Sequence, residues 1–165
     1  IEWIESQLIA EYGECQNNSE DFSPLADQPL LKGLPNSDLE TLQKNVTSTG
    51  YESGSKIIQL NEKADGIYFL RSGKVSVMVG DGIYVSSLDA GTCFGELALI
   101  APDATRTANI IADTKVFCSF LSIKAFNEIS LVNPSFNELL LRNLGFILFE
   151  RLKQNNSKII ALSAN

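Results

Sequence analysis

The chain has 165 residues, 44% of them hydrophobic, and a net charge of −7 from 20 acidic and 13 basic side chains. An acidic chain offers no broad basic surface, so nucleic acid and anionic lipid are not expected partners. The sequence contains no histidine, which excludes histidine-based catalytic triads, zincin motifs and the histidine metal sites of cupin barrels. No metal site and no cofactor are therefore expected.

The cysteines indicate a reducing environment. Cys15, Cys93 and Cys118 are odd in number and widely spaced, which is typical of free thiols rather than of a disulfide framework or a metal site. No apolar run reaches the roughly 18 residues that a membrane span needs, and no signal peptide is recognisable. We expect a cytoplasmic chain that does not insert into a membrane. Because it begins with Ile1 rather than Met, we also expect it to be a piece of a longer protein.

The first residues predict a short amphipathic helix. Ile1, Ile4, Leu8 and Tyr12 fall on one helical stripe, and a polar, acidic stretch follows it. The helix is either the tail of a preceding domain or an N-terminal helix that folds back on this one. We therefore divide the chain into a helix at 1–13, a linker at 14–28 and one domain at 29–165.

The domain opens with a second helix. Ser37 and Glu40 have the spacing of a capping box, in which each side chain accepts a hydrogen bond from the other residue's backbone. We expect Ser37 to be the N-cap of a helix that ends near Lys44.

From Val46 to Ser122 the pattern changes from helical to alternating, and glycines separate the runs. Many short strands between glycine turns predict an antiparallel sandwich or barrel, so the fold class is mainly β with flanking helices. The expected strands are Lys56–Leu60, Gly66–Arg71, Lys74–Val79, Ile83–Leu88, Thr107–Ala112 and Val116–Leu121.

Two helices are expected after the strands. The first covers Ser122–Leu131, and Pro134 can open the second at its first turn. Apolar residues crowd the segment 134–152 on more than one stripe, so this helix should bury two faces. One face can pack on the barrel, and the other needs a ligand, another helix or a second copy of the chain.

The segment GTCFGELALIAPDATRTANIIA, at 91–112, contains the candidate site. Gly95 precedes good helix formers, and the backbone N–H groups of such a turn favour an anion. Arg106 is the only basic residue between Lys74 and Lys115, so its guanidinium is a candidate phosphate ligand.

Glu96 would repel a phosphate, yet it could accept a hydrogen bond from a ribose hydroxyl attached to that phosphate. A phosphate together with a ribose hydroxyl implies a nucleotide. Spacing alone leaves a plain alternative open, in which Arg106 forms a surface ion pair with Glu96 or Asp103.

FGELALI followed by RTA resembles the phosphate-binding cassette of the cyclic nucleotide-binding domain family. The run ADGIYFLRSGKVSV at 64–77 resembles that family's ADxxYFIxxGxVxV stretch, and the similarity covers roughly 29–152. The resemblance implies an antiparallel β-roll, a jelly-roll-like barrel with N-terminal and C-terminal helices, that binds a 3′,5′-cyclic nucleotide. It also implies that the C-terminal helices move in response.

The resemblance assigns roles to residues of the cassette. Arg106 would hold the cyclic phosphate and Glu96 the ribose 2′-hydroxyl. Gly95, Leu97 and Ala98 would supply backbone amides or close the cassette, and Thr107 would touch phosphate or base, with Ala108 beside it. Candidate lid contacts over the base are Phe146, Ile147 and Phe149.

The chain departs from the family pattern at two positions. Thr105 stands where the family often has a proline directly before the arginine, which changes the shape of the cassette loop. Asn61 stands where a glycine is common, and Asn tolerates left-handed geometry. Neither departure removes a charged contact.

The identity of the nucleotide stays open. A Thr after the arginine is found in eukaryotic relatives that prefer cGMP, whereas in bacterial relatives a hydroxyl there serves cAMP, and we expect cAMP. The N-terminal EWIESQL also resembles the closing helix of STAS-type domains, which precede such modules in sulfate-permease-like transporters and some bacterial glutaminases. The partner within the parent protein would then be an upstream domain, and a transporter parent would place the module on the cytosolic side of the membrane.

Three functions compete at this stage. The first is a regulatory sensor for a cyclic nucleotide, and the second is a degenerate module that docks or forms a homodimer through the helix at 134–152 without a ligand. An enzyme ranks third, and no catalytic residue is expected. A helix-turn-helix transcription factor is disfavoured because only about a dozen residues follow Leu152.

Overall fold

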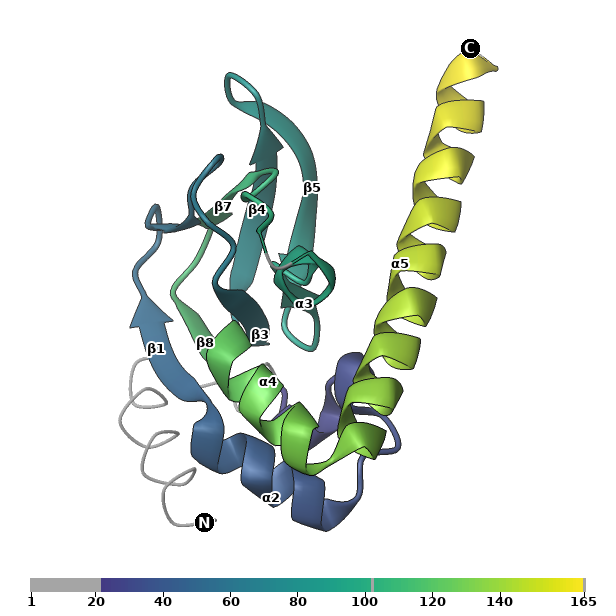
Figure 1. Ribbon diagram of the computed structural model, residues 1–165. Helices are drawn as coiled ribbons and strands as arrows, with labels where there is room; N and C mark the ends of the chain where they lie inside the picture. The colour runs from purple at the N-terminus through teal and green to yellow at the C-terminus, as the bar shows by residue number, and fades with distance from the viewer. Residues whose placement is uncertain (1–21, 102, 165) are drawn as a thin grey trace.

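The computed structural model describes residues 22–101 and 103–164, which form two four-stranded antiparallel sheets with helices beside them (Figure 1). The first sheet has the strand order β1-β8-β3-β6 and the second the order β2-β7-β4-β5. The strands are β1 (Thr47–Tyr51), β2 (Lys56–Ile58), β3 (Gly66–Ser72), β4 (Lys74–Val79), β5 (Ile83–Asp89), β6 (Cys93–Phe94), β7 (Asn109–Ala112) and β8 (Val116–Ser122).

Helices α2 and α4 and the start of α5 lie together at one end of the sheets, α3 lies beside β5, and the rest of α5 extends alongside the sheets (Figure 1). Among the described residues, none of the helices combines the length and the apolarity that crossing a bilayer requires. The helices are α2 (Asn36–Asn45), α3 (Leu97–Ile100), α4 (Ile123–Val132) and α5 (Pro134–Ser163), with 3-10 turns η2 (Leu25–Asp27) and η3 (Pro29–Leu31).

Strand β3 supplies two hydrophobic cores because its side chains alternate between its faces. Ile67 and Phe69 pack among residues of the helices, whereas Leu70 packs between the two sheets. All three are fully buried. A strand covered on both faces reads as a continuous apolar run, which is why this segment stands out in the sequence.

The pairing of β6 with β3 fixes the position of the turn that leads into α3. β6 pairs with β3 through Phe94 and Tyr68, whose rings stack with their centroids 5.1 Å apart. The chain leaves β6 directly into Gly95 and α3, so the position of this turn is fixed by a buried strand pair.

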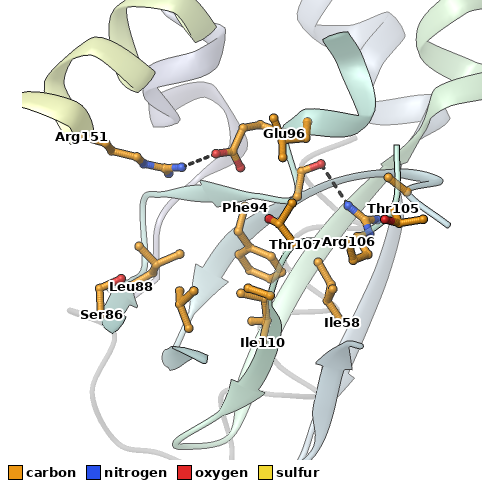
Figure 2. A pocket seen from close by; sticks show the side chains of 15 residues that line it. Ile58, Ser86, Leu88, Phe94, Glu96, Thr105, Arg106, Thr107, Ile110 and Arg151 are labelled. Carbon is orange, nitrogen blue, oxygen red and sulfur yellow. Dashed lines mark hydrogen bonds and ion pairs between the residues drawn. The ribbon is translucent and has the colours of Figure 1, made fainter. Parts of the chain in front are cut away.

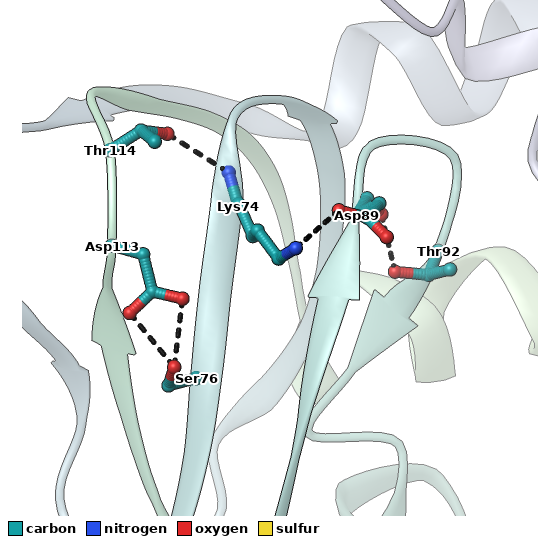
Figure 3. Close-up of polar contacts among 6 residues, drawn as sticks. All are labelled: Lys74, Ser76, Asp89, Thr92, Asp113 and Thr114. Atoms are coloured by element: carbon teal, nitrogen blue, oxygen red, sulfur yellow. Dashed lines mark hydrogen bonds and ion pairs between the residues drawn. The ribbon is translucent and has the colours of Figure 1, made fainter.

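Polar contacts join β4 to the residues that follow β7 and to the end of β5, at one end of the second sheet (Figure 3). The Ser76 hydroxyl on β4 lies 2.7 and 2.8 Å from the two carboxylate oxygens of Asp113, which follows β7. Lys74 forms an ion pair of 3.7 Å with Asp89 at the end of β5, and its backbone N–H donates to the Thr114 hydroxyl. These contacts fix the register of β4 against both neighbours.

The expected fold class is confirmed, and most expected strands lie where the alternation placed them. β1 and β6 were not predicted as strands. α2 departs from the expected cap, because Pro35 rather than Ser37 occupies the N-cap and no side chain caps it. α5 begins at Pro134 as expected but continues to Ser163, well beyond residue 152.

The domain boundaries stay predictions, and the expected helix at 1–13 lies outside the described residues. Leu25 and Gln28, from the segment interpreted as a linker, are both buried. Arg71 is also buried, and its guanidinium donates to the Ser23 carbonyl and the Ser119 hydroxyl. The last residues of the predicted linker therefore pack as part of the domain.

Candidate functional site

One pocket of the described residues lies between the second sheet, the turn that leads into α3, and α5. Its lining combines charged, hydroxyl-bearing and apolar side chains, and Figure 2 shows most of them pointing into the same space. The lining residues are Ile58, Ala64, Val77, Ser86, Leu88, Phe94, Gly95, Glu96, Leu97, Thr105, Arg106, Thr107, Ala108, Ile110 and Arg151.

Gly95 forms the bend by which the chain enters α3. Its φ of +77° lies in the left-handed region, which disfavours any residue with a side chain. A Cβ atom at this position would lie 2.6 Å from Nη1 of Arg106. The absence of a side chain therefore permits both the bend and the close approach of the guanidinium.

Arg106 is held in a fixed position at one end of the pocket. Its side chain is only 6% exposed, and its guanidinium donates to the Gly95 carbonyl at 3.0 Å, the Gly66 carbonyl at 2.9 Å and the Asp65 carboxylate at 2.8 Å. These bonds use three of the five N–H groups of a guanidinium. The buried cation is thus oriented before any ligand arrives, with further N–H groups for an anion.

Asp65 was not singled out in the sequence, although it lies inside the ADGIYF run. Its side chain is 66% exposed while its partner Arg106 is buried. The position of the ion pair is therefore set by Arg106, which two backbone carbonyls also hold. The only local signal was an acidic residue directly before the apolar run that begins β3.

Glu96 follows Gly95, and α5 contacts it directly. Nη1 of Arg151 donates to the Glu96 carboxylate at 2.6 Å (Figure 2), and Nη2 of the same side chain donates to the Cys93 carbonyl at 2.6 Å. The two side chains are 30% and 13% exposed, with glutamate the more buried. Two charge-assisted hydrogen bonds therefore join α5 to the pocket wall.

Nothing local in the sequence pointed to Arg151, because it lies 55 residues from Glu96. The contact arises from the packing of α5 beside β6 and α3, which the spacing of residues along the chain does not encode.

The remaining wall of the pocket is apolar with two hydroxyl groups. Ile58, Phe94 and Ile110 lie side by side in Figure 2, and Ser86 and Thr107 add hydroxyls to the lining. A pocket with one buried cation, one carboxylate and an apolar wall suits a ligand that carries an anion, a hydroxyl and a flat ring.

Cys93 lies next to this site but offers no nucleophile at neutral pH. Burial, with a further contribution from the charge of Glu96, raises the pKa of its thiol to about 12. The thiol therefore stays protonated.

The structure brings most of the predicted ligand residues together. Six of them line the pocket: Gly95, Glu96, Leu97, Arg106, Thr107 and Ala108. Ala98 is fully buried and donates its N–H to the Gly95 carbonyl, so it closes the turn. That these residues bind a ligand stays a prediction.

The three candidate lid residues do not line the pocket. Phe146 and Phe149 are 66% and 55% exposed, and Ile147 packs against the core beside the helices. Their role as a lid stays a prediction, and Arg151 is the residue through which α5 reaches the pocket.

Comparison with known protein families identifies the family to which the chain belongs. The family model "Cyclic nucleotide-binding domain" matches residues 49–132, which run from within β1 to the end of α4 and include the whole cassette. The chain belongs to the cyclic nucleotide-binding domain family.

Three relatives of this cyclic nucleotide-binding domain illustrate the similarity. Glutaminase 1 from Bradyrhizobium diazoefficiens is 38% identical over 99% of this chain and 26% of its own length. The cAMP-dependent protein kinase type II regulatory subunit from Drosophila melanogaster is 36% identical over 61% of this chain and 28% of its own length. The catabolite activator protein structure from Thermus thermophilus has a TM-score of 0.67 at 23% identity, covering 82% of this chain and 63% of the other, and shows the shared fold.

The domain spans about a quarter of the length of the glutaminase that it matches. The expected likeness to a module of a bacterial glutaminase is confirmed by this similarity. The run EWIESQL, on which that expectation rested, lies outside the described residues.

Proposed function

We propose that this domain is a regulatory module that binds a 3′,5′-cyclic nucleotide in the pocket beside α3. The observation that supports this most is the buried guanidinium of Arg106, held against the Gly95 turn at the end of an apolar pocket. A buried cation is costly unless it is paired and hydrogen-bonded, and within the described residues the one carboxylate that an ion pair joins to Arg106 is that of the exposed Asp65.

The ligand would lie across the pocket with its parts matched to the lining. The cyclic phosphate meets Arg106, the ribose 2′-hydroxyl donates to Glu96, and the base lies along the apolar wall that contains Phe94 and Ile110. No group of the pocket needs to accept or release a proton, so the proposal is a binding site and not an enzyme.

We favour cAMP over cGMP as the ligand. Relatives at about a third identity are named for cAMP, among them the Drosophila kinase regulatory subunit. Thr107 and Ser86 place hydroxyls in the pocket that either base could use, so the preference is a matter for measurement.

The response to the ligand would pass through Arg151. The ribose hydroxyl and Arg151 would act on the same Glu96 carboxylate, so a bound nucleotide changes how firmly α5 is held. A ligand can shift such an equilibrium only by its difference in affinity for the two arrangements, typically 1–3 kcal/mol. Movement of the C-terminal helix is therefore the proposed output.

The setting of the module is also part of this proposal. The partner that is regulated would be an upstream domain of the same chain, in the cytoplasm, and the match to only about a quarter of Glutaminase 1 supports the presence of a further domain. A docking module without ligand is the alternative, and the exposed apolar residues of α5 favour it.

Titration calorimetry of the 165-residue chain with cAMP, cGMP and 5′-AMP tests the proposal. We expect the cyclic nucleotides to bind and Arg106→Gln to weaken binding by about 30-fold or more, since it removes a charge-assisted contact of about 2 kcal/mol. Arg142→Gln is the matched control, because Arg142 is an exposed arginine on α5.

Two results would overturn the proposal. One is no binding of cAMP or cGMP by the unmodified chain at millimolar concentration, which the docking alternative predicts. The other is equal binding by the unmodified chain and by folded Arg106→Gln.

A further inference from the structure

The second half of α5 is exposed along its whole length. The last buried residue of this helix is Leu144, and every side chain from residue 152 to residue 164 is exposed. Figure 1 shows this segment, in yellow, standing clear of the other elements. An isolated helix shorter than about 12–15 residues is marginal in water, so a packing partner would stabilise this half of α5.

Apolar side chains gather on one side of the exposed segment. At about 100° per residue, five of them fall within an arc of roughly 160° around the helix. Lys153 lies just beyond one edge of this arc and Lys158 just beyond the other, and residues 151–163 carry no acidic side chain. The five residues of this apolar arc, which are between 55% and 78% exposed, are Phe149, Leu152, Ile159, Ile160 and Leu162.

Two amides limit what can cover the apolar arc. Asn155 and Asn156 fall between its apolar members. A purely hydrocarbon surface would leave these amides without hydrogen bonds, which is costly. The occupant should therefore combine apolar side chains with polar groups, and its charges should be negative because lysines flank the arc.

The first 21 residues of the chain have this composition. They contain six of the 20 acidic side chains and none of the 13 basic ones. The apolar stripe predicted there consists of Ile1, Ile4, Leu8 and Tyr12. At about 100° per residue, Glu11 falls at one edge of this stripe and Glu5 at the other. An apolar stripe between two carboxylates complements an apolar arc between two lysines.

We propose that residues 1–12, which lie outside the described residues, dock as a helix on the apolar arc of α5 in the same chain. The stripe would pack on the arc, and the glutamates would lie along the edges that carry the lysines. The Tyr12 hydroxyl and the carboxylates can accept hydrogen bonds from Asn155 and Asn156. Each helix alone is marginal in water, and burying apolar surface between them would stabilise both.

The described chain begins close enough to α5 for this contact. Ser23 lies against the turn between β5 and β6, where a Cβ at Gly91 would be 3.5 Å from the Ser23 hydroxyl oxygen. Two residues further on, the Cys93 carbonyl accepts the hydrogen bond from Arg151 of α5. The segment 13–21 can extend over about 30 Å, and the exposed half of α5 is about 20 Å long.

The contact does not require a nucleotide. Arg151 lies outside the apolar arc and bonds to Glu96 and to the Cys93 carbonyl, so α5 would serve the pocket with one side and residues 1–12 with another. Movement of α5, the proposed response to a ligand, would then be transmitted to the N-terminal segment of the chain.

Paramagnetic relaxation in nuclear magnetic resonance spectra of the 165-residue chain, without nucleotide, measures the contact. A nitroxide is attached at Ser157→Cys, an exposed position outside the arc, in a Cys15→Ser background in which both remaining thiols are buried. Trp3 is the single tryptophan of the chain, so its indole N–H signal is identified directly. We expect the nitroxide to broaden this signal severalfold relative to the reduced label.

Two variants of α5 locate the contact. We expect Ile159→Asp to weaken docking by at least about tenfold, because a carboxylate would be buried within the arc, and the broadening of the Trp3 signal to be lost. The matched control is Ala161→Asp, an exposed residue on the same turn but outside the arc, which should retain the broadening. Circular dichroism shows whether both variants remain folded.

An exchange of charges tests the pairing of the edges. Lys153→Glu together with Lys158→Glu should reduce the broadening, since like charges would then meet. Adding Glu5→Lys and Glu11→Lys to this variant should restore it. Lys44→Glu, which changes an exposed lysine on α2, should leave it unchanged.

The inference fails if the nitroxide does not broaden the Trp3 signal, or if Ile159→Asp shows as much broadening as Ala161→Asp. It also fails if the exchange of charges does not restore the broadening. A mixture of spin-labelled chains with unlabelled, isotope-enriched chains reports contacts between copies alone. Broadening of equal size in that mixture would assign the arc to a second copy and overturn the inference as well.

Discussion

Gly95 meets two requirements at once, a left-handed backbone and room for a guanidinium, and a pair of glycine variants separates them. Gly54 has a similar φ of +86°, but a Cβ there would meet nothing within 4 Å. Both Gly95→Ala and Gly54→Ala should lose about 1–2 kcal/mol of stability from the backbone alone.

Only Gly95→Ala should displace Arg106. We therefore expect Gly95→Ala to lower cAMP affinity tenfold or more, in addition to its loss of stability, and Gly54→Ala to leave the affinity unchanged. Calorimetry and urea denaturation measure the two effects. Equal affinities in both variants would show that the position of Arg106 does not depend on Gly95.

The burial of Cys93 and Cys118 predicts how folding stability changes with pH. Burial raises the pKa of both Cys93 and Cys118 to about 12, from an ordinary value of 9.0. Between these values the unfolded chain releases thiol protons that the folded chain retains, so folding stability is full below pH 9 and falls as the pH rises toward 12.

Urea denaturation at pH 7 and pH 10.5 should show a lower midpoint at the higher pH in the unmodified chain. Replacing both thiols (Cys93→Ala with Cys118→Ala) should reduce the difference between the two midpoints. A difference that persists unchanged would exclude the thiols as its source, leaving the half-buried Tyr51 and Tyr68, whose pKa values partial burial also raises.

At the level of residues, the sequence identified the charged groups that lie close together along the chain. Glu96 and Arg106 fall within one motif, and the structure places both in one pocket. Asp65 and Arg151 reach the same place from distant segments. Their contacts arise from the packing of β3 and α5, which no local spacing encodes.

At the level of elements, α5 is joined to the site by one side chain, so Arg151→Gln is an informative variant. It removes charge-assisted bonds to Glu96 and the Cys93 carbonyl, which we expect to cost about 1.5–3 kcal/mol of stability. Hydrogen exchange in α5 should become faster near residue 151, and cAMP should change that exchange less than in the unmodified chain.

Arg142→Gln is the control here too, because it changes an exposed arginine on the same helix. If cAMP alters exchange in α5 equally in Arg151→Gln and in the unmodified chain, the signal does not pass through Arg151.

Strands with strong alternation were predicted from sequence, and those without it were not. β4 lies at its predicted bounds because Val75 and Val77 alternate with polar residues. β1 reads TSTGY and has no apolar alternation, and it exists as a strand because it pairs along β8. The end of α5 was missed for a related reason, since a polar run interrupts the apolar pattern that a single buried face would show.

For the whole molecule, β3 connects the two cores, so the domain should unfold as one unit. Phe69 faces the helices and Leu70 faces the second sheet, and both are fully buried. Phe69→Ala and Leu70→Ala should each cost about 2–5 kcal/mol.

Far-ultraviolet circular dichroism and tyrosine fluorescence should give coincident urea transitions for each of these variants. Two separate transitions would show instead that the helical core and the core between the sheets are independent.

The net charge of the chain is negative, whereas the buried charge at the end of the pocket is positive. An acidic molecule of net charge −7 places one buried cation at the end of an apolar pocket. The absence of histidine is compatible with a site that would bind an anion through permanent charge, because a guanidinium needs no change of protonation near neutral pH.

A crystal structure of the chain with cAMP is the measurement that tests the central proposal most directly. It should show the cyclic phosphate on the Arg106 guanidinium and the ribose 2′-hydroxyl on the Glu96 carboxylate. Nucleotide bound at another place on the domain, or in this pocket with its phosphate away from Arg106, would contradict the account.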